Sequence, residues 1–187
     1  CDDTIGLMFA EFGRGLIRLR LGDFAEAREY WLVALRLARQ CEHHTLEPQI
    51  LSFVGYAWFC EGRYGKAASY LERSLSAAER IGDGIAIASS TRHLGEIARY
   101  QQRWDEARSW YQRALEAERN RGQHGRNQYL DELNLALVDL GTGRFDAALE
   151  RLDGLAEAYA EFSLTFALPI LAMAEAAACA GAGQRDA

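Results

Sequence analysis

The sequence lacks an uninterrupted apolar stretch of the length that crosses a bilayer, which is about 20 residues. Its most apolar region, residues 162–182, is interrupted by Thr165, Pro169 and Glu175. The chain of 187 residues has a net charge of −6, so it lacks the basic excess that a general nucleic-acid binder carries. We therefore expect neither a membrane segment nor a nucleic-acid-binding surface in this part of the protein.

Cysteine is also scarce, and its spacing does not predict a disulfide framework. The four cysteines form no CxxC pair and are far apart, at Cys1, Cys41, Cys60 and Cys179. We expect them to be reduced, small and mostly buried. The run Cys41-Glu42-His43-His44 contains potential metal ligands, but adjacent histidines on a helix point in different directions and no second ligand cluster is present. The sequence predicts no metal site and no cofactor.

Motifs that carry catalysis or nucleotide binding are missing. The chain contains no GxxxxGK[ST], no GxGxxG after a strand, no GxSxG and no HExxH. The acidic pair Asp105-Glu106 stands where a helix is expected to begin, and the helix dipole stabilises negative charge there. We predict that the chain is not an enzyme.

Strand signals are missing as well, and the composition is that of a helical protein. Alanine, leucine, arginine and glutamate dominate, and there are only two prolines. No segment alternates polar and apolar residues with the β-branched enrichment of a strand. The predicted fold class is all-α.

An aromatic residue followed by small or apolar residues at helical spacing recurs along the chain. In one copy Trp104 is followed by Ala107, Tyr111 and Ala114. The equivalent aromatic residues lie 40, 40 and 41 residues apart, at Phe24, Tyr64, Trp104 and Phe145. In the last copy the series runs Phe145, Ala148, Leu152, Leu155. We expect each aromatic residue to open the second helix of a helical hairpin.

A small residue precedes each of these aromatic residues by nine positions, at Gly15, Gly55, Gly95 and Ala136. Small residues let two helices approach closely, and we expect the rings to fill the space between successive units. Pro48 and Pro169 each lie 16 residues before an aromatic position, Tyr64 and Arg185, where a first helix would begin and proline is tolerated.

The pattern resembles the tetratricopeptide repeat (TPR) over roughly residues 5–187, with the best agreement at Leu94-Gly95 and from Trp104 to Ala114. The period of 40 is longer than the common TPR period of about 34 and is similar to that of kinesin light chains, spindle-orientation adaptors and arrays in bacterial transcription regulators and kinases. HEAT repeats share the period but do not require the aromatic residue. The chain departs from the TPR pattern at Arg14, Ser74, Asp139 and Arg185.

This resemblance implies a right-handed superhelical solenoid whose first helices line the inner, concave face. We expect a single array over residues 1–187, cut from a longer protein, with four helix-turn-helix repeats and a closing helix. The expected repeats are about 5–44, 45–84, 85–125 and 126–165, with a partial fifth at 166–187.

The inner positions of the first helices predict a partner-binding surface. The candidate residues, all at inner positions of the second to fourth repeats, are Tyr56, Phe59, Arg92, Glu96, Arg99, Leu133 and Leu137. Arg92 and Arg99 are seven residues apart on one helix, and arginine presents a fork of donors that suits a carboxylate. An acidic peptide is therefore one expected partner. Against this, Glu96 lies between the arginines and could pair with Arg92, and the apolar inner positions could simply be buried.

The function predicted is protein–protein interaction, as a scaffold or regulatory segment of a cytoplasmic, bacterial protein. The alternative, implied by the similarity to bacterial regulators, is a domain of a transcription regulator or kinase that senses a ligand or signalling peptide. The sequence leaves the partner and the oligomeric state open.

Overall fold

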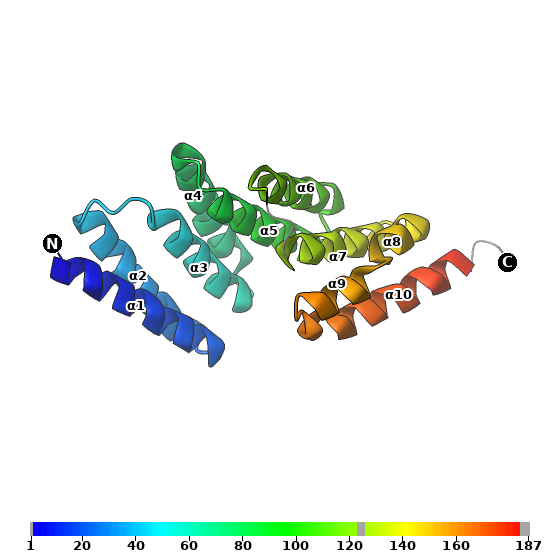
Figure 1. Cartoon of the computed structure of the whole chain (residues 1–187), viewed down its shortest axis with the longest axis horizontal. Helices are drawn as coiled ribbons and strands as arrows, with labels where there is room; N and C mark the ends of the chain where they lie inside the picture. Colours follow the sequence, from blue (N-terminus) through cyan, green and yellow to red (C-terminus); the bar gives the residue numbers. More distant parts are fainter. Residues whose placement is uncertain (1, 123–125, 184–187) are drawn as a thin grey trace. The chain divides into compact units, whose positions relative to one another are not determined.

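A computed structural model describes residues 2–122 and 126–183, and this part of the chain is helical throughout (Figure 1). In chain order the elements are α1 (Asp2–Arg20), α2 (Phe24–Gln40), α3 (Glu47–Cys60), α4 (Tyr64–Ile81), α5 (Gly84–Tyr100), α6 (Trp104–Asn120), α7 (Arg126–Gly141), α8 (Phe145–Leu152), α9 (Leu155–Glu161), the 3₁₀ helix η1 (Thr165–Ala167) and α10 (Leu168–Gly183). Helices make up more than two thirds of the described residues, and these contain no strand. The all-α prediction is confirmed.

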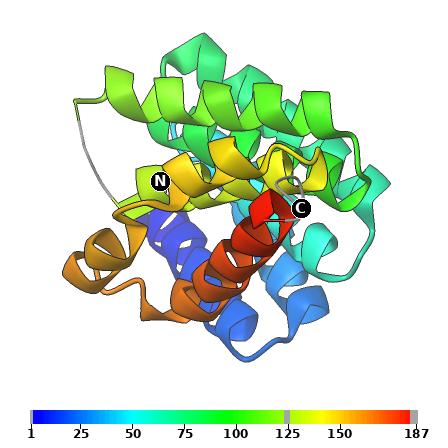
Figure 2. The ribbon, with the colours of Figure 1, turned by 90° about the vertical axis from the view of Figure 1, so that its right-hand side faces the viewer.

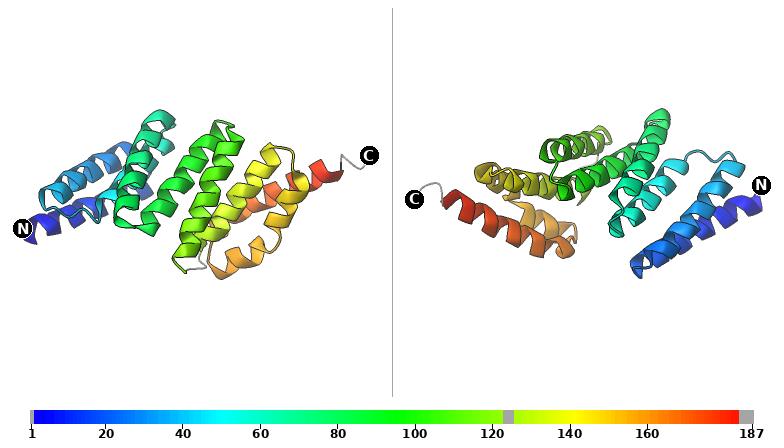
Figure 3. Two further views of the ribbon diagram at one scale, coloured as in Figure 1. Left: turned by 90° about the horizontal axis from the view of Figure 1, so that it is seen from above. Right: turned by 180° about the vertical axis from the view of Figure 1, so that it is seen from behind.

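The predicted register is also confirmed. Helices α2, α4, α6 and α8 begin at the four aromatic residues of the repeat, Phe24, Tyr64, Trp104 and Phe145. Pro48 lies in the first turn of α3, and Pro169 is the second residue of α10. In the pairs α1 with α2, α3 with α4 and α7 with α8, the two helices lie side by side and run in opposite directions (Figure 3).

The chain divides into two compact units, and the boundary falls within α5. Unit 1 is Cys1–Ile97 and unit 2 is Ala98–Ala187. Unit 1 therefore holds α1 to α4 and most of α5. Unit 2 holds the last residues of α5 and the helices from α6 to α10.

The helices of unit 1 approach most closely at the small positions of the repeat. A Cβ added to Gly15 on α1 would lie 2.3 Å from Nε1 of Trp31 on α2. Trp31 is fully buried there, and its indole N–H donates a hydrogen bond of 3.2 Å to the backbone carbonyl of Phe12. A Cβ on Gly55 would similarly lie 2.7 Å from Cγ of Leu71. In each hairpin, a large side chain of the second helix therefore fills the space next to a glycine of the first helix.

In unit 2, the opening ring of a second helix packs against the first helix of the next repeat. A Cβ on Gly141 would lie 2.5 Å from the Trp104 ring, and one on Gly181 would lie 2.4 Å from the Phe145 ring. Gly141 and Gly181 are 40 residues apart, so this contact follows the period of the repeat. These rings fill the space between successive repeats, as the sequence predicted.

The fourth repeat differs from its prediction, because its second helix is broken. Helix α8 ends at Leu152, and the chain turns at Gly154, which has φ +73°. Leu155 therefore begins the separate helix α9 instead of extending α8, although it remains buried in the same hydrophobic core. Figure 2 shows α9 and η1 leading back to α10, which packs against α8.

Helix α10 is apolar and only partly covered. Met173 is 72% exposed, Leu168 and Ile170 are also exposed, and Phe166 in the preceding η1 is 62% exposed. Residues Thr165–Gly183, with mean hydropathy 1.5, are long and apolar enough to cross a membrane by length and composition alone. A core helix of a soluble protein passes the same test, so the expected absence of a membrane segment stays a prediction.

The expectation that the cysteines are mostly buried is wrong for the part of the chain that the structure describes. Cys41 and Cys60 are half-buried, Cys179 is exposed, and all three are free thiols. Cys41 follows the last residue of α2, Cys60 is the last residue of α3, and Cys179 lies on the exposed side of α10. Cys1 and the fifth aromatic position, Arg185, lie outside the described residues.

Replacing Gly15 with alanine tests the close approach of α1 and α2. We expect Gly15→Ala to lower the free energy of unfolding by about 1–3 kcal/mol, because the new methyl group overlaps the Trp31 indole. Gly13→Ala is the matched control on the same helix. A Cβ at Gly13 meets nothing within 4 Å, so this change should stabilise the helix by about 0.5–1 kcal/mol. Chemical denaturation of both variants would measure the difference, and equal stabilities would contradict the packing described here.

Candidate functional site

The predicted binding residues of unit 1 lie on α3 and α5, which run next to each other. Two contacts connect these helices. The hydroxyl oxygens of Ser52 and Ser89 are 3.1 Å apart, and the rings of Tyr56 and His93 have centroids 4.8 Å apart. Both pairs are separated by 37 residues, so successive turns of α3 meet successive turns of α5. We call this surface the α3–α5 face and define it by Tyr56, Phe59, Arg92, His93 and Glu96.

The aromatic residues of the α3–α5 face are held in place without being fully buried. Tyr56 stacks on Phe59 with ring centroids 6.2 Å apart, and Phe59 contacts the Tyr64 ring at 5.7 Å. Tyr56, Phe59 and His93 are all half-buried. A cluster of rings that is fixed on one side and open on the other can accept an apolar or cationic side chain.

Cys60 adjoins this face but is not a reactive thiol. Burial raises the pKa of Cys60, a hydrogen bond with Tyr56 lowers it, and the nearby charges of Glu96 and Glu61 raise it further. The thiol therefore stays protonated at neutral pH, and a protonated thiol is a poor nucleophile. The charge of Glu96 on α5 thus acts on the Cys60 thiol at the end of α3.

His93 is a residue of this face that the sequence reasoning missed. Burial, together with the charge of Arg92, lowers its pKa to about 3. Its Nδ1 atom is buried and has no hydrogen-bond partner among the described residues. The ring is thus neutral at pH 7, and Arg92 supplies the positive charge beside it. The repeat pattern carried no signal for this contact, because the 40-residue period aligns Tyr56 with Glu96, whereas in the structure its ring meets His93.

The other predicted binding residues belong to unit 2 and have different surroundings. Arg99 contacts two rings, with Nε 3.4 Å from the Tyr111 hydroxyl and its guanidinium 4.8 Å from the Tyr100 centroid. Leu133 is only 4% exposed and packs in the core formed by α7, α8, α9 and α10, so the structure places it away from any open surface. Leu137 packs against the same core but is partly exposed.

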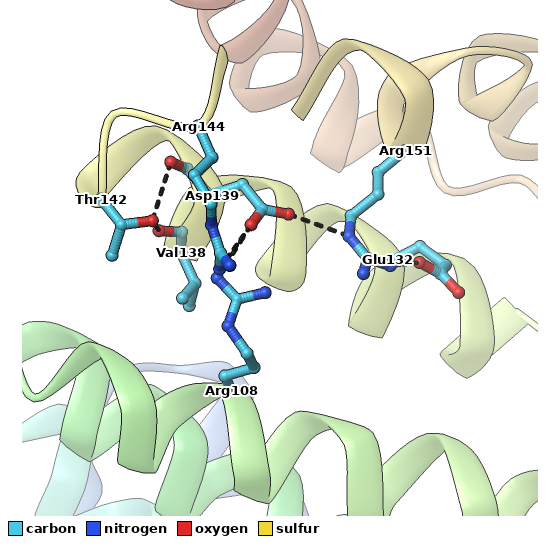
Figure 4. A network of polar contacts seen from close by, with 7 residues as sticks. All are labelled: Arg108, Glu132, Val138, Asp139, Thr142, Arg144 and Arg151. Carbon is cyan, nitrogen blue, oxygen red and sulfur yellow. Dashed lines mark hydrogen bonds and ion pairs between the residues drawn. The ribbon is translucent and has the colours of Figure 1, made fainter. Parts of the chain in front are cut away.

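A second polar cluster surrounds Asp139 on α7, where the repeat pattern calls for a ring (Figure 4). The carboxylate is 1% exposed and is enclosed by three arginines. Its Oδ1 accepts from Arg108 and pairs with Arg144, both at 2.8 Å, and its Oδ2 accepts from Arg151 at 2.9 Å. Arg151 also binds Glu132 at 2.7 Å. The cluster connects α6, α7 and α8, so we interpret it as structural.

The other internal departure from the repeat pattern, Ser74, is explained in the same way. Ser74 is fully buried on α4 and donates a hydrogen bond of 2.5 Å to the carbonyl of Pro48 on α3. It accepts one of 2.8 Å from the hydroxyl of Ser90 on α5. A buried hydroxyl is costly without partners, and here both of its bonding directions are used.

Metal binding finds no support in the described residues, which contain no group of three His, Cys, Asp or Glu side chains placed to hold an ion. His43 and His44 both lie after the end of α2. His43 is within 3.1 Å of the Thr45 hydroxyl, and His44 lies 4.0 Å from Glu47. Their contacts are those of ordinary surface residues.

Comparison with known proteins supports the family that the repeat pattern indicated. Residues 47–120, which span α3 to α6, match the tetratricopeptide repeat family. No curated protein sequence matches the chain. The matched segment is similar to tetratricopeptide repeats, and the chain as a whole has the fold of proteins built from them.

Three solved structures show the same fold at low identity. BtubC (BKLC) from P. vanneervenii is 21% identical, with a TM-score of 0.73 over 97% of this chain and 79% of that one. A Podosopora anserina protein described as a kinesin light chain with nearly identical TPR-like repeats is 14% identical, with a TM-score of 0.72 over 96% and 88%. The apo form of RapI is 16% identical, with a TM-score of 0.72 over 89% of this chain and 48% of RapI. At these identities the likeness establishes the fold alone. The predicted similarity to kinesin light chain repeats is confirmed at that level.

Removing the charge at Asp139 tests the structural role of its cluster. Asp139→Asn leaves three arginines without their shared carboxylate, and breaking a buried ion pair costs about 3–5 kcal/mol. We expect the free energy of unfolding, measured by urea denaturation, to fall by that amount. Asp153→Asn is the control, because Asp153 is exposed, and it should change stability by less than about 0.5 kcal/mol. Equal effects of the two changes would show that the buried pairs do not hold α6, α7 and α8 together.

The pKa of His93 predicts a loss of stability in mild acid. The folded-state pKa of about 3 lies below the unfolded value of 6.5, so the unfolded chain binds a proton first as the pH falls. This group therefore lowers the free energy of unfolding progressively below pH 6.5, by about 2 kcal/mol at pH 5. His93→Phe keeps a ring against Tyr56 and should remove this loss, whereas the same change at exposed His44 should retain it. Denaturation at pH 7 and pH 5 would measure it, and an unchanged difference in His93→Phe would refute the assignment.

Proposed function

We propose that this chain binds a peptide or protein partner through the α3–α5 face. Tetratricopeptide repeats generally serve protein–protein interaction and are typically not catalytic, and the matched residues 47–120 include every residue of this face. The observation that carries the proposal is that the Tyr56 ring stacks on Phe59 and contacts His93, which fixes rings on a surface that remains partly open.

The charges of the face define the kind of partner. Arg92 offers a planar fork of donors to a carboxylate, and the neutral His93 ring beside it adds no second charge. The rings next to them suit an apolar side chain. The proposed ligand is therefore a peptide segment that presents a carboxylate beside an apolar or aromatic residue.

The wider role proposed is that of a scaffold or regulatory segment of a cytoplasmic, bacterial protein. The free thiols of Cys41, Cys60 and Cys179 support a reducing compartment. In the alternative, the chain senses a ligand or signalling peptide for an attached kinase or transcription regulator. The two roles differ in the parent reading frame, where an adjoining effector domain would favour sensing.

Charge reversal at Arg92 tests the proposed face. A partner is first captured with the intact chain and identified, and its affinity is then measured by calorimetry. Arg92→Glu should weaken binding at least tenfold, which is about 1.4 kcal/mol, while the helical circular dichroism signal is retained. Arg92→Lys keeps the positive charge but lacks the planar guanidinium that binds a carboxylate through two hydrogen bonds. Its affinity should therefore lie between those of the original chain and of Arg92→Glu.

The matched control is Arg80→Glu on α4, because Arg80 is an exposed arginine outside the face. It should leave the affinity within twofold of the original. If Arg92→Glu and Arg80→Glu have the same effect, the α3–α5 face is not the binding surface. If neither has any effect, Arg99 and the edge of the unit 2 core at Leu137 are the next predicted residues to change.

A further inference from the structure

A basic groove lies on unit 1 between α2 and α4, the second helices of two successive repeats. Its volume is about 320 Å³. Leu32 and Leu35 on α2 and Tyr70 on α4 form its apolar part. Arg36, Arg39 and Arg73 line it as well. None of these residues belongs to the α3–α5 face, which is built from the first helices of the repeats. We call this surface the α2–α4 groove.

The charge of the groove is opposite to that of the chain. Three arginines and one acidic residue, Glu29, line it, and Glu47 pairs with Arg39, so the groove keeps an excess of positive charge while the whole chain carries −6. The positive electrostatic potential of these arginines is therefore confined to the groove, on a chain that is negative overall. Such a surface attracts an acidic group and disfavours a basic one.

The three arginines are not equally available. Arg39 binds the Glu47 carboxylate through Nε at 3.0 Å and through Nη2 at 2.5 Å. Arg73 lies with its guanidinium 5.0 Å from the centroid of the Tyr70 ring. Within residues 2–122 and 126–183, neither Arg36 nor Arg73 forms an ion pair, and both are exposed. These two guanidinium groups, one on each helix, therefore have donors available to a ligand.

We propose that the α2–α4 groove binds an acidic peptide segment of a protein partner, with carboxylates on Arg36 and Arg73 and an apolar side chain against Leu32 and Tyr70. Arginine binds carboxylates in a two-pronged geometry, and a cation held over a ring is oriented before the ligand arrives. The apolar floor would add the hydrophobic contact that a purely electrostatic site lacks.

Two features favour a peptide over a nucleic acid. Nucleic-acid binding requires many cations along a continuous path, whereas this groove has two available arginines on a chain with a net charge of −6. Leu32, Leu35 and Tyr70 match an apolar side chain better than a sugar-phosphate backbone. The proposal is independent of the α3–α5 face, since the two surfaces use different helices.

The test uses the full chain and a short fluorescent peptide that repeats Glu-Leu-Glu, with a Gln-Leu-Gln peptide of the same length as its neutral match. Fluorescence anisotropy measures both affinities at low and moderate salt. We expect the acidic peptide to bind at least tenfold more tightly than the neutral one, and its affinity to fall with salt. The double variant Arg36→Glu with Arg73→Glu should bind the acidic peptide at least tenfold more weakly than the original chain.

The control variant carries Arg20→Glu with Arg80→Glu, which makes the same change in net charge at exposed arginines outside the groove. It should keep at least half of the original affinity. Equal losses in both double variants would show a general charge effect and overturn the site. Equal binding of the acidic and neutral peptides would also overturn the site, as would tighter binding of a single-stranded RNA oligonucleotide than of the acidic peptide. A dimer of the chain that is lost in the double variant Arg36→Glu with Arg73→Glu would overturn it as well.

The two proposed surfaces are separated by their variants. The Glu-Leu-Glu peptide also carries the groups that the α3–α5 face is proposed to bind, so it is titrated against Arg92→Glu alone and against Arg92→Glu combined with Arg36→Glu and Arg73→Glu. Binding by the groove should remain in Arg92→Glu and should fall at least tenfold in the combined variant. If Arg92→Glu abolishes binding of the peptide and Arg36→Glu with Arg73→Glu does not, the acidic peptide occupies the α3–α5 face and the groove proposal fails while the proposed function stands.

Discussion

The close approach of paired helices at positions without a side chain is the constraint on which the rest of this structure depends. At Gly15 and Gly55 the partner helix supplies a large side chain, Trp31 or Leu71, that occupies the space a Cβ would need. Between repeats, Gly141 and Gly181 receive the rings of Trp104 and Phe145 in the same way. Contacts within a hairpin and contacts between repeats therefore follow the same rule: a glycine on one helix faces a large side chain on the neighbouring helix.

Where the repeat pattern is broken inside the array, polar contacts replace the missing apolar ones. Asp139 stands in the place of a ring and is enclosed by Arg108, Arg144 and Arg151. Ser74 stands in the place of an alanine and is bonded to Pro48 and Ser90. Both substitutions bury a polar group, and both provide the partners that make burial tolerable. A buried ion cluster of this kind favours one arrangement of helices, because any other arrangement would leave a charge unpaired.

Repeat architecture gives this chain two kinds of surface that can change independently. The α3–α5 face is built from first helices and combines half-buried rings with Arg92 and Glu96. The α2–α4 groove is built from second helices and is lined by arginines. The buried residues between them, such as Trp31 and Val54, belong to neither surface. Because each repeat contacts mainly its neighbours, either surface can acquire a partner without altering the packing of the other.

The sequence by itself determined the elements and their register. The all-α fold, the helix starts at Phe24, Tyr64, Trp104 and Phe145, and the places of Pro48 and Pro169 all followed from spacing, because helical periodicity and proline geometry are local properties of the chain. The tertiary structure alone decided which side chains remain available. It buried Leu133, paired His93 with Tyr56, and ended α8 at Leu152 so that Leu155 begins a new helix. Burial and pairing depend on what the neighbouring repeat places opposite a residue, and that partner lies about 40 residues away along the chain, beyond the reach of any local pattern.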